Sequence, residues 1–181
     1  TESSFENKPV VPFDKLNLIF PPTEYELFIA LSYSNLNQIR REKYEFAIQK
    51  GYKLASYIST KATILSQVIG ANCFILEDNT IQPFVSIGNN VTLWSGNHIG
   101  HHSIIKDHVF ISSHVVISGG VEIGEQSFLG VNSTIRDHVK IGVKNIIGAG
   151  ALILKSCEDE GLYIGTRTDR SQKLSSQIRK I

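Results

Sequence analysis

All six histidines of this 181-residue chain lie between positions 98 and 138, and three of them fall within the segment GNHIGHHS. These three are His98, His101 and His102. A neutral imidazole accepts a proton near physiological pH, so it suits a general base that deprotonates an attacking amine or hydroxyl. For the isolated His108 and His138 we expect solvent-facing corners instead. The cluster therefore predicts a reaction centre between residues 98 and 102.

The element that must position these histidines is a six-residue repeat. Every sixth residue from Ile69 to Ile153 is isoleucine or leucine, without an insertion. A period of six fits neither an α-helix nor one long strand, but it fits short strands joined by tight corners. Three hexads then make one triangular coil, and residues 18 apart stack at the strand spacing of about 4.8 Å. We predict a parallel β-helix with about five coils between Lys61 and Leu154.

The remaining hexad positions also follow a pattern. The residue four places after each aliphatic one is small or β-branched, and we expect it to point into the same narrow interior. Seven glycines directly follow an aliphatic residue, and we expect them to form corners with positive φ. These glycines are Gly70, Gly88, Gly100, Gly124, Gly130, Gly142 and Gly148.

The 18-residue period places Gly119 directly beside His101, one coil further along the same corner. A bare backbone next to a base leaves room for a reacting carbonyl, and its N–H group suits the stabilisation of an oxyanion. By the same stacking of corners, Asp107 and Asp137 are candidate carboxylates that orient the base.

The ends of the chain lack the repeat, so we divide the chain into residues 1–60, 61–170 and 171–181. Residues 1–60 read as a small α/β unit, and 171–181 as a polar, basic tail or short helix. The predicted elements of the first part are a buried strand over Tyr25–Tyr33, a helix over Asn35–Lys50 that starts with a capping box of Asn35 and Gln38 and ends at Gly51, and a strand over Lys53–Ile58.

Composition excludes several classes of protein. The chain has 18 Lys and Arg against 17 Asp and Glu, so it lacks the basic surplus of a nucleic-acid-binding domain. No apolar run approaches the roughly 20 residues of a membrane span, and the polar start of the chain predicts no secretory signal. Two cysteines, Cys73 and Cys157, make no disulfide framework, so we expect reduced thiols in a cytoplasmic protein.

The repeat resembles the left-handed β-helix of the hexapeptide-repeat acyltransferases. Within that group, the segment Gln82–Gly124 and the closing GLYIGTRTDR, Gly161–Arg170, are similar to the family of sialic acid O-acetyltransferases and bacterial amino-sugar N-acetyltransferases. The resemblance covers about residues 10–170. It implies a homotrimer that transfers an acetyl group from acetyl-CoA to a nucleotide-linked sugar in surface-polysaccharide synthesis. It also implies the left hand of the β-helix.

The resemblance assigns roles to particular residues. It aligns the catalytic base with His101, and His98 and His102 are the alternatives. In this family the N-terminal α/β domain helps to hold the nucleotide-linked sugar. Its glycine-rich turn either precedes Thr1 or is missing from this protein. The implied contacts with acetyl-CoA are Gly119, Phe110 (aligned with a histidine of the family), Val131, Gly148, Lys155, Gly165 and Arg167.

The chain also departs from the family's pattern. Acidic residues often flank the catalytic histidine, whereas here Gly100 precedes His101 and His102 follows it. In the closing motif, 166–168 read Thr-Arg-Thr where Val or Thr, Pro and Ala are usual. Lys155, Arg167 and Arg170 either are solvated or pair with the phosphates of the donor. The outward-facing Trp94 either packs in a trimer seam or forms a platform for sugar or cofactor.

Several functions remain open at this point. N-acetylation of an amino sugar and O-acetylation of a hydroxyl require the same base and donor. A zinc hydrolyase of the carbonic anhydrase type shares the fold, but it needs three histidines that include a pair five residues apart, and this chain has no such pair. We therefore expect no metal. A β-helix scaffold without catalysis is the remaining alternative.

Overall fold

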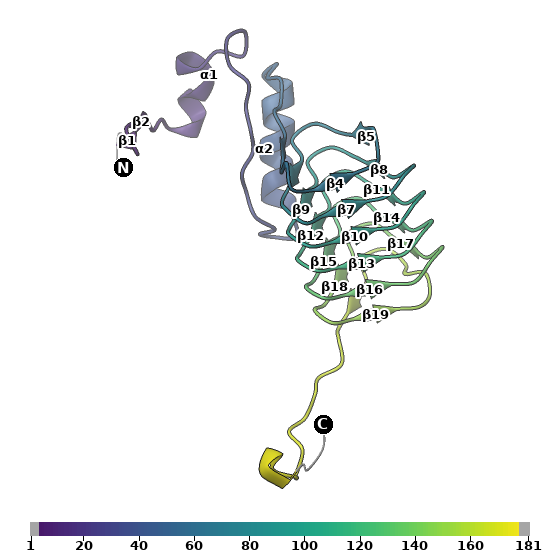
Figure 1. The fold of residues 1–181 in the computed structure, drawn as a ribbon. Coiled ribbons are helices and arrows are strands. Elements are labelled where there is room, and N and C mark those ends of the chain that lie inside the picture. The colour runs from purple at the N-terminus through teal and green to yellow at the C-terminus, as the bar shows by residue number, and fades with distance from the viewer. Residues whose placement is uncertain (1–3, 178–181) are drawn as a thin grey trace.

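The computed structural model describes residues 4–177, and its main body is a parallel β-helix with three flat faces (Figure 1). Strands of two residues recur on each face in turn, and 18-residue stacking is confirmed in the central coils by pairs such as His98 with Val116 and Ile99 with Ile117. The predicted fold is therefore correct, and six, five and seven strands stack on the three faces because the coils continue slightly beyond the predicted range of Lys61–Leu154.

The six-stranded face consists of β4 (Thr63–Ile64), β7 (Thr80–Ile81), β10 (His98–Ile99), β13 (Val116–Ile117), β16 (Thr134–Ile135) and β19 (Leu152–Ile153). The five-stranded face consists of β5 (Val68–Ile69), β8 (Ser86–Ile87), β11 (Ile104–Ile105), β14 (Glu122–Ile123) and β17 (Lys140–Ile141). The seven-stranded face consists of β3 (Tyr57–Ile58), β6 (Phe74–Ile75), β9 (Thr92–Leu93), β12 (Phe110–Ile111), β15 (Phe128–Leu129), β18 (Ile146–Ile147) and β20 (Leu162–Tyr163).

Three edges join these faces. We call the edge between the six- and five-stranded faces the histidine edge; it contains residues 82–85, 100–103, 118–121 and 136–139. The tryptophan edge joins the seven- and six-stranded faces and contains residues 94–97, 112–115, 130–133 and 148–151. The acidic edge joins the five- and seven-stranded faces and contains residues 88–91, 106–109, 124–127 and 142–145.

The interior matches the predicted pattern. The aliphatic series from Ile75 to Ile147 is at most 2% exposed, and the small residues four places later are buried as well. Polar members of this second series bind the backbone of the corners: Asn97 Oδ1, for example, accepts a hydrogen bond from the N–H of Val115 at 2.7 Å. Each strand thus contributes one large and one small side chain to a dry, narrow core.

We predicted positive φ at the glycines that directly follow an aliphatic residue, and this prediction is wrong. The seven glycines after the aliphatic residues lack positive φ. They permit close approach instead, since a Cβ on Gly70 would lie 2.5 Å from the carbonyl oxygen of Gly88. Positive φ occurs instead at the third residue after each aliphatic one, which is two places after the glycine position of the hexad. The residues with positive φ at this place are Asn72, Asp78, Phe84, Asn90, Gly96, His102, His108, His114, Gly120, Gln126, Asn132, His138, Lys144 and Gly150.

This corner position explains much of the histidine content. Asn, Asp and His adopt the left-handed conformation more readily than other residues with a Cβ. Four of the six histidines, His102, His108, His114 and His138, occupy it. His98 and His101 do not, so backbone conformation does not account for them.

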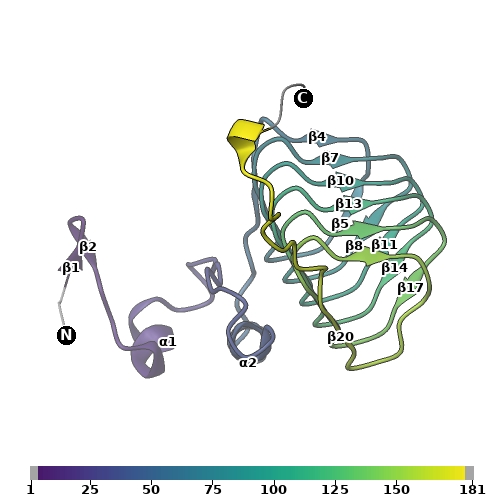
Figure 2. The same ribbon diagram turned by 90° about the horizontal axis from the view of Figure 1, so that it is seen from below.

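The N-terminal part differs from the predicted α/β unit. It contains a small hairpin of β1 (Ser4–Phe5) and β2 (Lys8–Pro9), a 3₁₀ turn η1 (Phe13–Lys15), α1 (Leu16–Ile19) and α2 (Gln38–Gln49). Figures 1 and 2 show α2 beside the coils and the hairpin well away from them. The C-terminal part is extended and contains a 3₁₀ turn, η2 (Ser175–Gln177); the predicted tail's residues 178–181 lie outside the described range.

The predicted strand over Tyr25–Tyr33 is wrong, because within residues 4–177 its strand-like contact is a single parallel bridge between Leu27 and Leu54. Tyr25 and Tyr33 are 45% and 50% exposed. The predicted strand over 53–58 likewise reduces to this bridge and β3, which already belongs to the first coil. An extended segment with one bridging neighbour cannot build a buried sheet.

The predicted helix exists but begins three residues later. Asn35, Leu36 and Asn37 all have positive φ, which excludes them from the helix and abolishes the predicted capping box. The Asn37 amide instead donates to the carbonyls of Gln126 and Ser127, each at 3.2 Å. The predicted end is confirmed, since Gly51 follows the helix with φ +84°.

A buried arginine fixes α2 against the coils. Arg40 is 1% exposed. Its Nη1 donates to Thr92 Oγ1, and its Nη2 donates to Asn37 Oδ1 (3.2 Å) and to the carbonyls of His108 (2.9 Å) and Val109 (3.2 Å). No described carboxylate forms a salt bridge with it, and its Nε has no partner. Burial therefore lowers the pKa of Arg40 to about 10.

Arg40 and its neighbour Arg41 allow a matched test of this contact. Arg40→Ala leaves several buried neutral acceptors without a donor, so we expect a loss of about 1–3 kcal/mol in the free energy of unfolding. Arg41 pairs with Glu45 and Glu125 at the surface, so Arg41→Ala is expected to cost about 0–1 kcal/mol. Denaturant unfolding followed by circular dichroism measures both. Equal losses of stability in the two variants would contradict the conclusion that Arg40 fixes α2 against the coils.

Candidate active site

The predicted stacking of His101 on Gly119 is confirmed. His101 lies at the histidine edge just after β10, and its ring covers Gly119 so closely that a Cβ there would lie 2.7 Å from Cε1 and 2.8 Å from Nε2. The next N–H, that of Gly120, donates to the His101 carbonyl at 2.8 Å. Within residues 4–177 the Gly119 N–H donates no hydrogen bond. The imidazole thus occupies the position that a side chain at 119 would take, and it packs against a residue whose N–H donates to no described residue.

His102 contacts the same imidazole from the other side. The Nδ1 atoms of His101 and His102 are 3.0 Å apart, and the His102 ring packs on Phe84 at 4.7 Å between centroids. A neutral imidazole has one N–H, so one of the two rings donates and the other accepts. When His101 donates through Nδ1, its Nε2 carries the lone pair that a base requires. His102 therefore lies where it can select the tautomer of His101.

The third histidine of the cluster lies apart. His98 projects outward from β10 on the six-stranded face, between Thr80 and Val116 of the neighbouring strands. It is half-buried and makes no side-chain hydrogen bond to a residue in the described range.

The two predicted orienting carboxylates do not contact His101. Asp107 lies on the acidic edge, where Oδ1 accepts from the N–H of Asn89 at 2.7 Å. Asp137 is on the histidine edge two coils beyond His101, and its Oδ2 lies 4.0 Å from His138 Nε2. The stacking rule placed Asp137 at the correct edge but at too great a distance.

The expected solvent-facing corner is found for His138 but not for His108. The side chain of His138 is 78% exposed. His108 is 5% exposed, its Nδ1 lies 2.8 Å from Asn90 Nδ2, and its ring packs edge-on against Tyr44. Burial lowers the pKa of His108. The helix α2 covers this corner, which the sequence pattern of the repeat does not reveal.

The candidate contacts for the donor divide between two edges. Val131, Gly148 and the adjoining Gly165, which packs against Ala149, lie at the tryptophan edge. Lys155 is exposed and continues the histidine edge, 18 residues after Asp137.

Two further candidates lie elsewhere. The Arg167 side chain is 91% exposed in the C-terminal segment, and Phe110 is 2% exposed within the seven-stranded face beneath Tyr33. Phe110 is therefore closed to a ligand from solution in the single chain.

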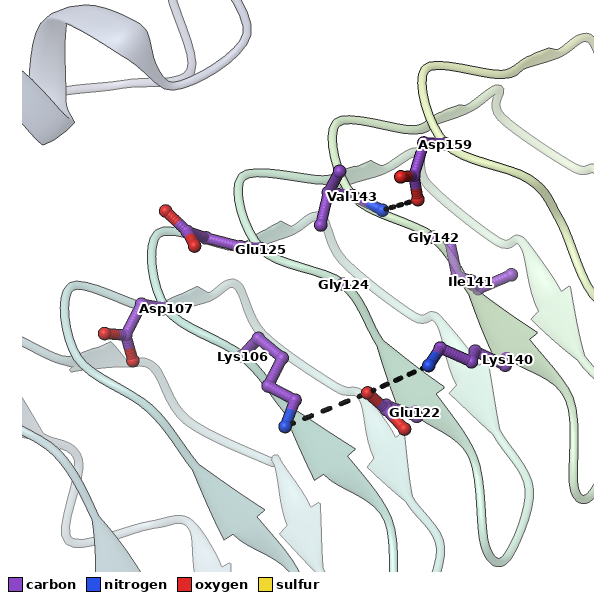
Figure 3. Close-up of a pocket in the computed structure, with 10 residues that line it drawn as sticks. All are labelled: Lys106, Asp107, Glu122, Gly124, Glu125, Lys140, Ile141, Gly142, Val143 and Asp159. Carbon is purple, nitrogen blue, oxygen red and sulfur yellow. Dashed lines mark hydrogen bonds and ion pairs between the residues drawn. The ribbon is translucent and has the colours of Figure 1, made fainter.

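A charged groove on the five-stranded face contains Asp107 but none of the predicted catalytic histidines or donor contacts (Figure 3). Glu122 lies at its centre, 3.8 Å from the ammonium of Lys106 and 3.7 Å from that of Lys140. Asp159 accepts from the N–H of Val143 at the far end. These side chains pair with one another, so the groove offers no concentrated charge. Within residues 4–177 no cluster of three or more His, Cys, Asp or Glu is arranged to hold a metal ion.

Sequence reasoning missed a cavity beside Trp94. It lies between the extended segment 28–32 and the seven-stranded face, and its apolar lining includes Phe74 and Phe110. A signal was present, since Phe74, Phe110 and Phe128 all precede an aliphatic hexad residue and so project outward from one face. The cover over these rings belongs to the non-repeating part of the chain, which the period does not place.

Comparisons with known proteins agree with this fold. The family described as bacterial transferase hexapeptide (six repeats) matches residues 68–101 and 84–119. The acetyltransferase domain of PglB from Neisseria gonorrhoeae, in complex with acetyl coenzyme A, superposes with a TM-score of 0.80 and 26% identity, over 90% of this chain and 78% of that one. The repeat and the fold of this chain are therefore similar to those of the left-handed β-helix, hexapeptide-repeat acyltransferases.

Two other structures share this fold. A mutant of perosamine N-acetyltransferase from Caulobacter crescentus, in complex with CoA and GDP-perosamine, has a TM-score of 0.81 and 24% identity, over 87% of this chain and 75% of that one. WeeI from Acinetobacter baumannii has a TM-score of 0.75 and 23% identity, over 90% and 77%. In the described part of the chain, no helix has the length and apolar character needed to cross a membrane.

Two glycines of the histidine edge provide a test of the site geometry. A Cβ on Gly100 would lie 2.5 Å from the backbone of Ser118, so Gly100→Ala should lower the midpoint of thermal unfolding. A Cβ on Gly119 meets the end of the His101 ring instead, an exposed side chain that can shift to make room. Gly119→Ala should therefore keep the midpoint but shift the NMR signals of the His101 ring. Unchanged His101 signals in Gly119→Ala would contradict the stacking.

Proposed function

We propose that this protein transfers the acetyl group of acetyl-CoA to the amino group of a nucleotide-linked sugar, with His101 as the general base. The observation that carries the proposal is the exposed His101 ring packed against Gly119, whose N–H donates to no residue in the range 4–177. These are the two groups that acyl transfer requires, a proton acceptor and an oxyanion donor. The similarity to acetyltransferases with bound CoA, acetyl-CoA and GDP-perosamine supports the substrates.

The reaction balances with these groups. The amine of the acceptor attacks the carbonyl carbon of the thioester, and the Gly119 N–H donates to the oxygen as negative charge develops. His101 Nε2 takes the proton of the amine, the C–S bond breaks, and the proton passes to the departing thiolate of CoA. Direct transfer is favoured over an acyl-cysteine, because both cysteines are buried and burial raises the pKa of Cys73 to about 11.

The proposal also includes three finer assignments. N-acetylation is favoured over O-acetylation, because perosamine N-acetyltransferase is among the similar structures. We place the reaction in the cytoplasm and in surface-polysaccharide synthesis, where nucleotide-linked amino sugars are consumed. Lys155 and Arg167 are the cations that we assign to the phosphates of the donor.

We further propose that the active form is a homotrimer with its sites between copies. The site residues lie on the two edges that border the six-stranded face: His101 and Gly119 on one, and Val131, Gly148 and Gly165 on the other. Within one chain, the width of the six-stranded face separates the histidine edge from the tryptophan edge. A closed ring of three copies brings the histidine edge of each copy against the tryptophan edge of the next.

Replacement of the base tests the mechanism. His101→Asn should retain the fold and the affinity for acetyl-CoA while kcat falls by about 10²- to 10⁴-fold, the usual contribution of a general base. His98→Asn and His102→Asn should each cost less. The limb of the pH–rate profile that reports the titrating base should disappear only in His101→Asn. Near-normal turnover of this variant, with loss in His98→Asn, would transfer the role to His98.

The oligomeric state tests the shared site. Sedimentation equilibrium at micromolar concentration should give about three times the 20.1 kDa of one chain. A fully active monomer would overturn the arrangement, because one chain alone does not bring the two edges together.

A further inference from the structure

The dipeptide Gly119–Gly120 lies between two imidazoles, and the mechanism above uses one of them. His101 reaches Gly119 from the preceding coil, and His138 reaches Gly120 from the following coil. A Cβ on Gly120 would lie 2.6 Å from His138 Nδ1, as one on Gly119 would lie 2.8 Å from His101 Nε2. The backbone fixes both histidines to this dipeptide, since the Gly120 N–H donates to the His101 carbonyl at 2.8 Å and the His138 N–H donates to the Gly119 carbonyl at 3.0 Å.

The position of His138 along the edge distinguishes it from a similar histidine elsewhere. His114 also has positive φ, and its ring covers Gly96 so closely that a Cβ there would lie 2.5 Å from Nδ1, but it lies on the tryptophan edge. His138 shares the histidine edge and the glycine pair with His101. Consecutive Cα atoms are about 3.8 Å apart, so a small group bound at this dipeptide reaches both rings. The side chain of His138 is 78% exposed and therefore open to a ligand.

The two imidazoles have different charged neighbours. His101 contacts the imidazole of His102, whereas His138 Nε2 lies 4.0 Å from Asp137 Oδ2 and forms an ion pair with it when protonated. In that state both ring nitrogens of His138 carry a proton, so Nδ1 is a donor on the side of Gly120. The other charged residues of this edge near His138 are Arg136 and Lys155, and both are exposed.

The sequence of groups along the histidine edge follows the order of groups in the donor. His101, Gly119, Asp137 and Lys155 succeed one another at intervals of one coil, which is about 4.8 Å in the regular part. In acetyl-CoA the acetyl carbonyl is followed by the sulfur, the pantetheine arm and the phosphates. With the carbonyl at His101 and Gly119 and the phosphates at Lys155, the sulfur lies on the side of Gly119 that faces His138.

We propose that His138 is a second catalytic residue, the general acid that protonates the departing sulfur of CoA. As the C–S bond breaks, the sulfur takes the bonding electron pair, and the proton on His138 Nδ1 passes to it. The proton that His101 has taken from the amine then returns to His138 through solvent, so the net transfer is from amine to thiolate. The inference rests on the proposed acetyl transfer, and it adds the group that completes it.

Contact between His138 and the sulfur is tested by binding alone, without an acceptor. CoA and desulfo-CoA, which lacks the sulfur, are titrated separately into the wild-type protein while the NMR signals of the histidine rings are followed. CoA should shift the His138 signals clearly more than desulfo-CoA does, and the signals of His114 should not distinguish the two compounds. Equal responses of His138 to both compounds would overturn this inference alone, whereas failure to bind CoA would overturn the proposed function.

Kinetics test proton transfer, with His114→Asn as the matched control. Asparagine adopts the left-handed corner as readily as histidine, so His138→Asn and His114→Asn should both keep the midpoint of thermal unfolding. With a nucleotide-linked amino sugar that the wild type acetylates, GDP-perosamine being tried first, His138→Asn should lower kcat by roughly 10- to 100-fold and His114→Asn should not. The fall of kcat at alkaline pH, where His138 loses its proton, should disappear in His138→Asn, while the acid limb that reports His101 remains.

A better leaving group separates an acid from a structural residue. A selenol is more acidic than a thiol, and a more acidic leaving group departs more readily without a proton. With the selenium analogue of acetyl-CoA, most of the kcat deficit of His138→Asn should therefore disappear, while the deficit of His101→Asn should persist. An equal deficit of His138→Asn with both donors, or no deficit with either, would overturn the inference.

Discussion

The narrow interior of the β-helix is the constraint on which the rest of the structure depends. Each two-residue strand places one aliphatic and one small side chain inside, and nothing larger fits between three sheets that close on themselves. This requirement repeats every six residues and imposes a register of 18 in the central coils. This register stacks His101 on Gly119 in the next coil, and it places Trp94 and His101 in the same coil. The geometry of the candidate site is therefore a consequence of how the core is filled.

Periodicity explains which features the sequence predicts. The interior series, the stacking of His101 on Gly119 and the exposure of Trp94 all follow from position within the hexad, because every central coil has the same backbone. The corner conformation was assigned to the wrong glycines, since two different demands select glycine: close approach of coils at Gly70 and positive φ at Gly96. Residue type alone does not distinguish between them.

The unpredicted features all involve the non-repeating N-terminal part. The burial of Arg40 and His108 and the cavity beside Trp94 arise where α2 and the segment 28–33 cover the coils. A sequence pattern reports the periodicity of one element, but it does not report which side chains of a second element lie against it. From the sequence alone, an arginine in a helix is expected to be exposed to solvent. The contacts of Arg40 with Asn37 and Thr92 in the structure show instead a buried cation that is bound by neutral acceptors.

The left-handed corner residue has a consequence for how such a protein acquires chemistry. Asn, Asp, Gly and His account for most of the residues at this position on the three edges. All four adopt the left-handed conformation more readily than other residues, so the fold tolerates their exchange at each coil. An imidazole can therefore be added beside an existing one, as His102 is beside His101, without disturbing the core. The β-helix thus separates the residues that determine its stability from those that determine its reactivity, and a new proton acceptor requires a change at one corner only.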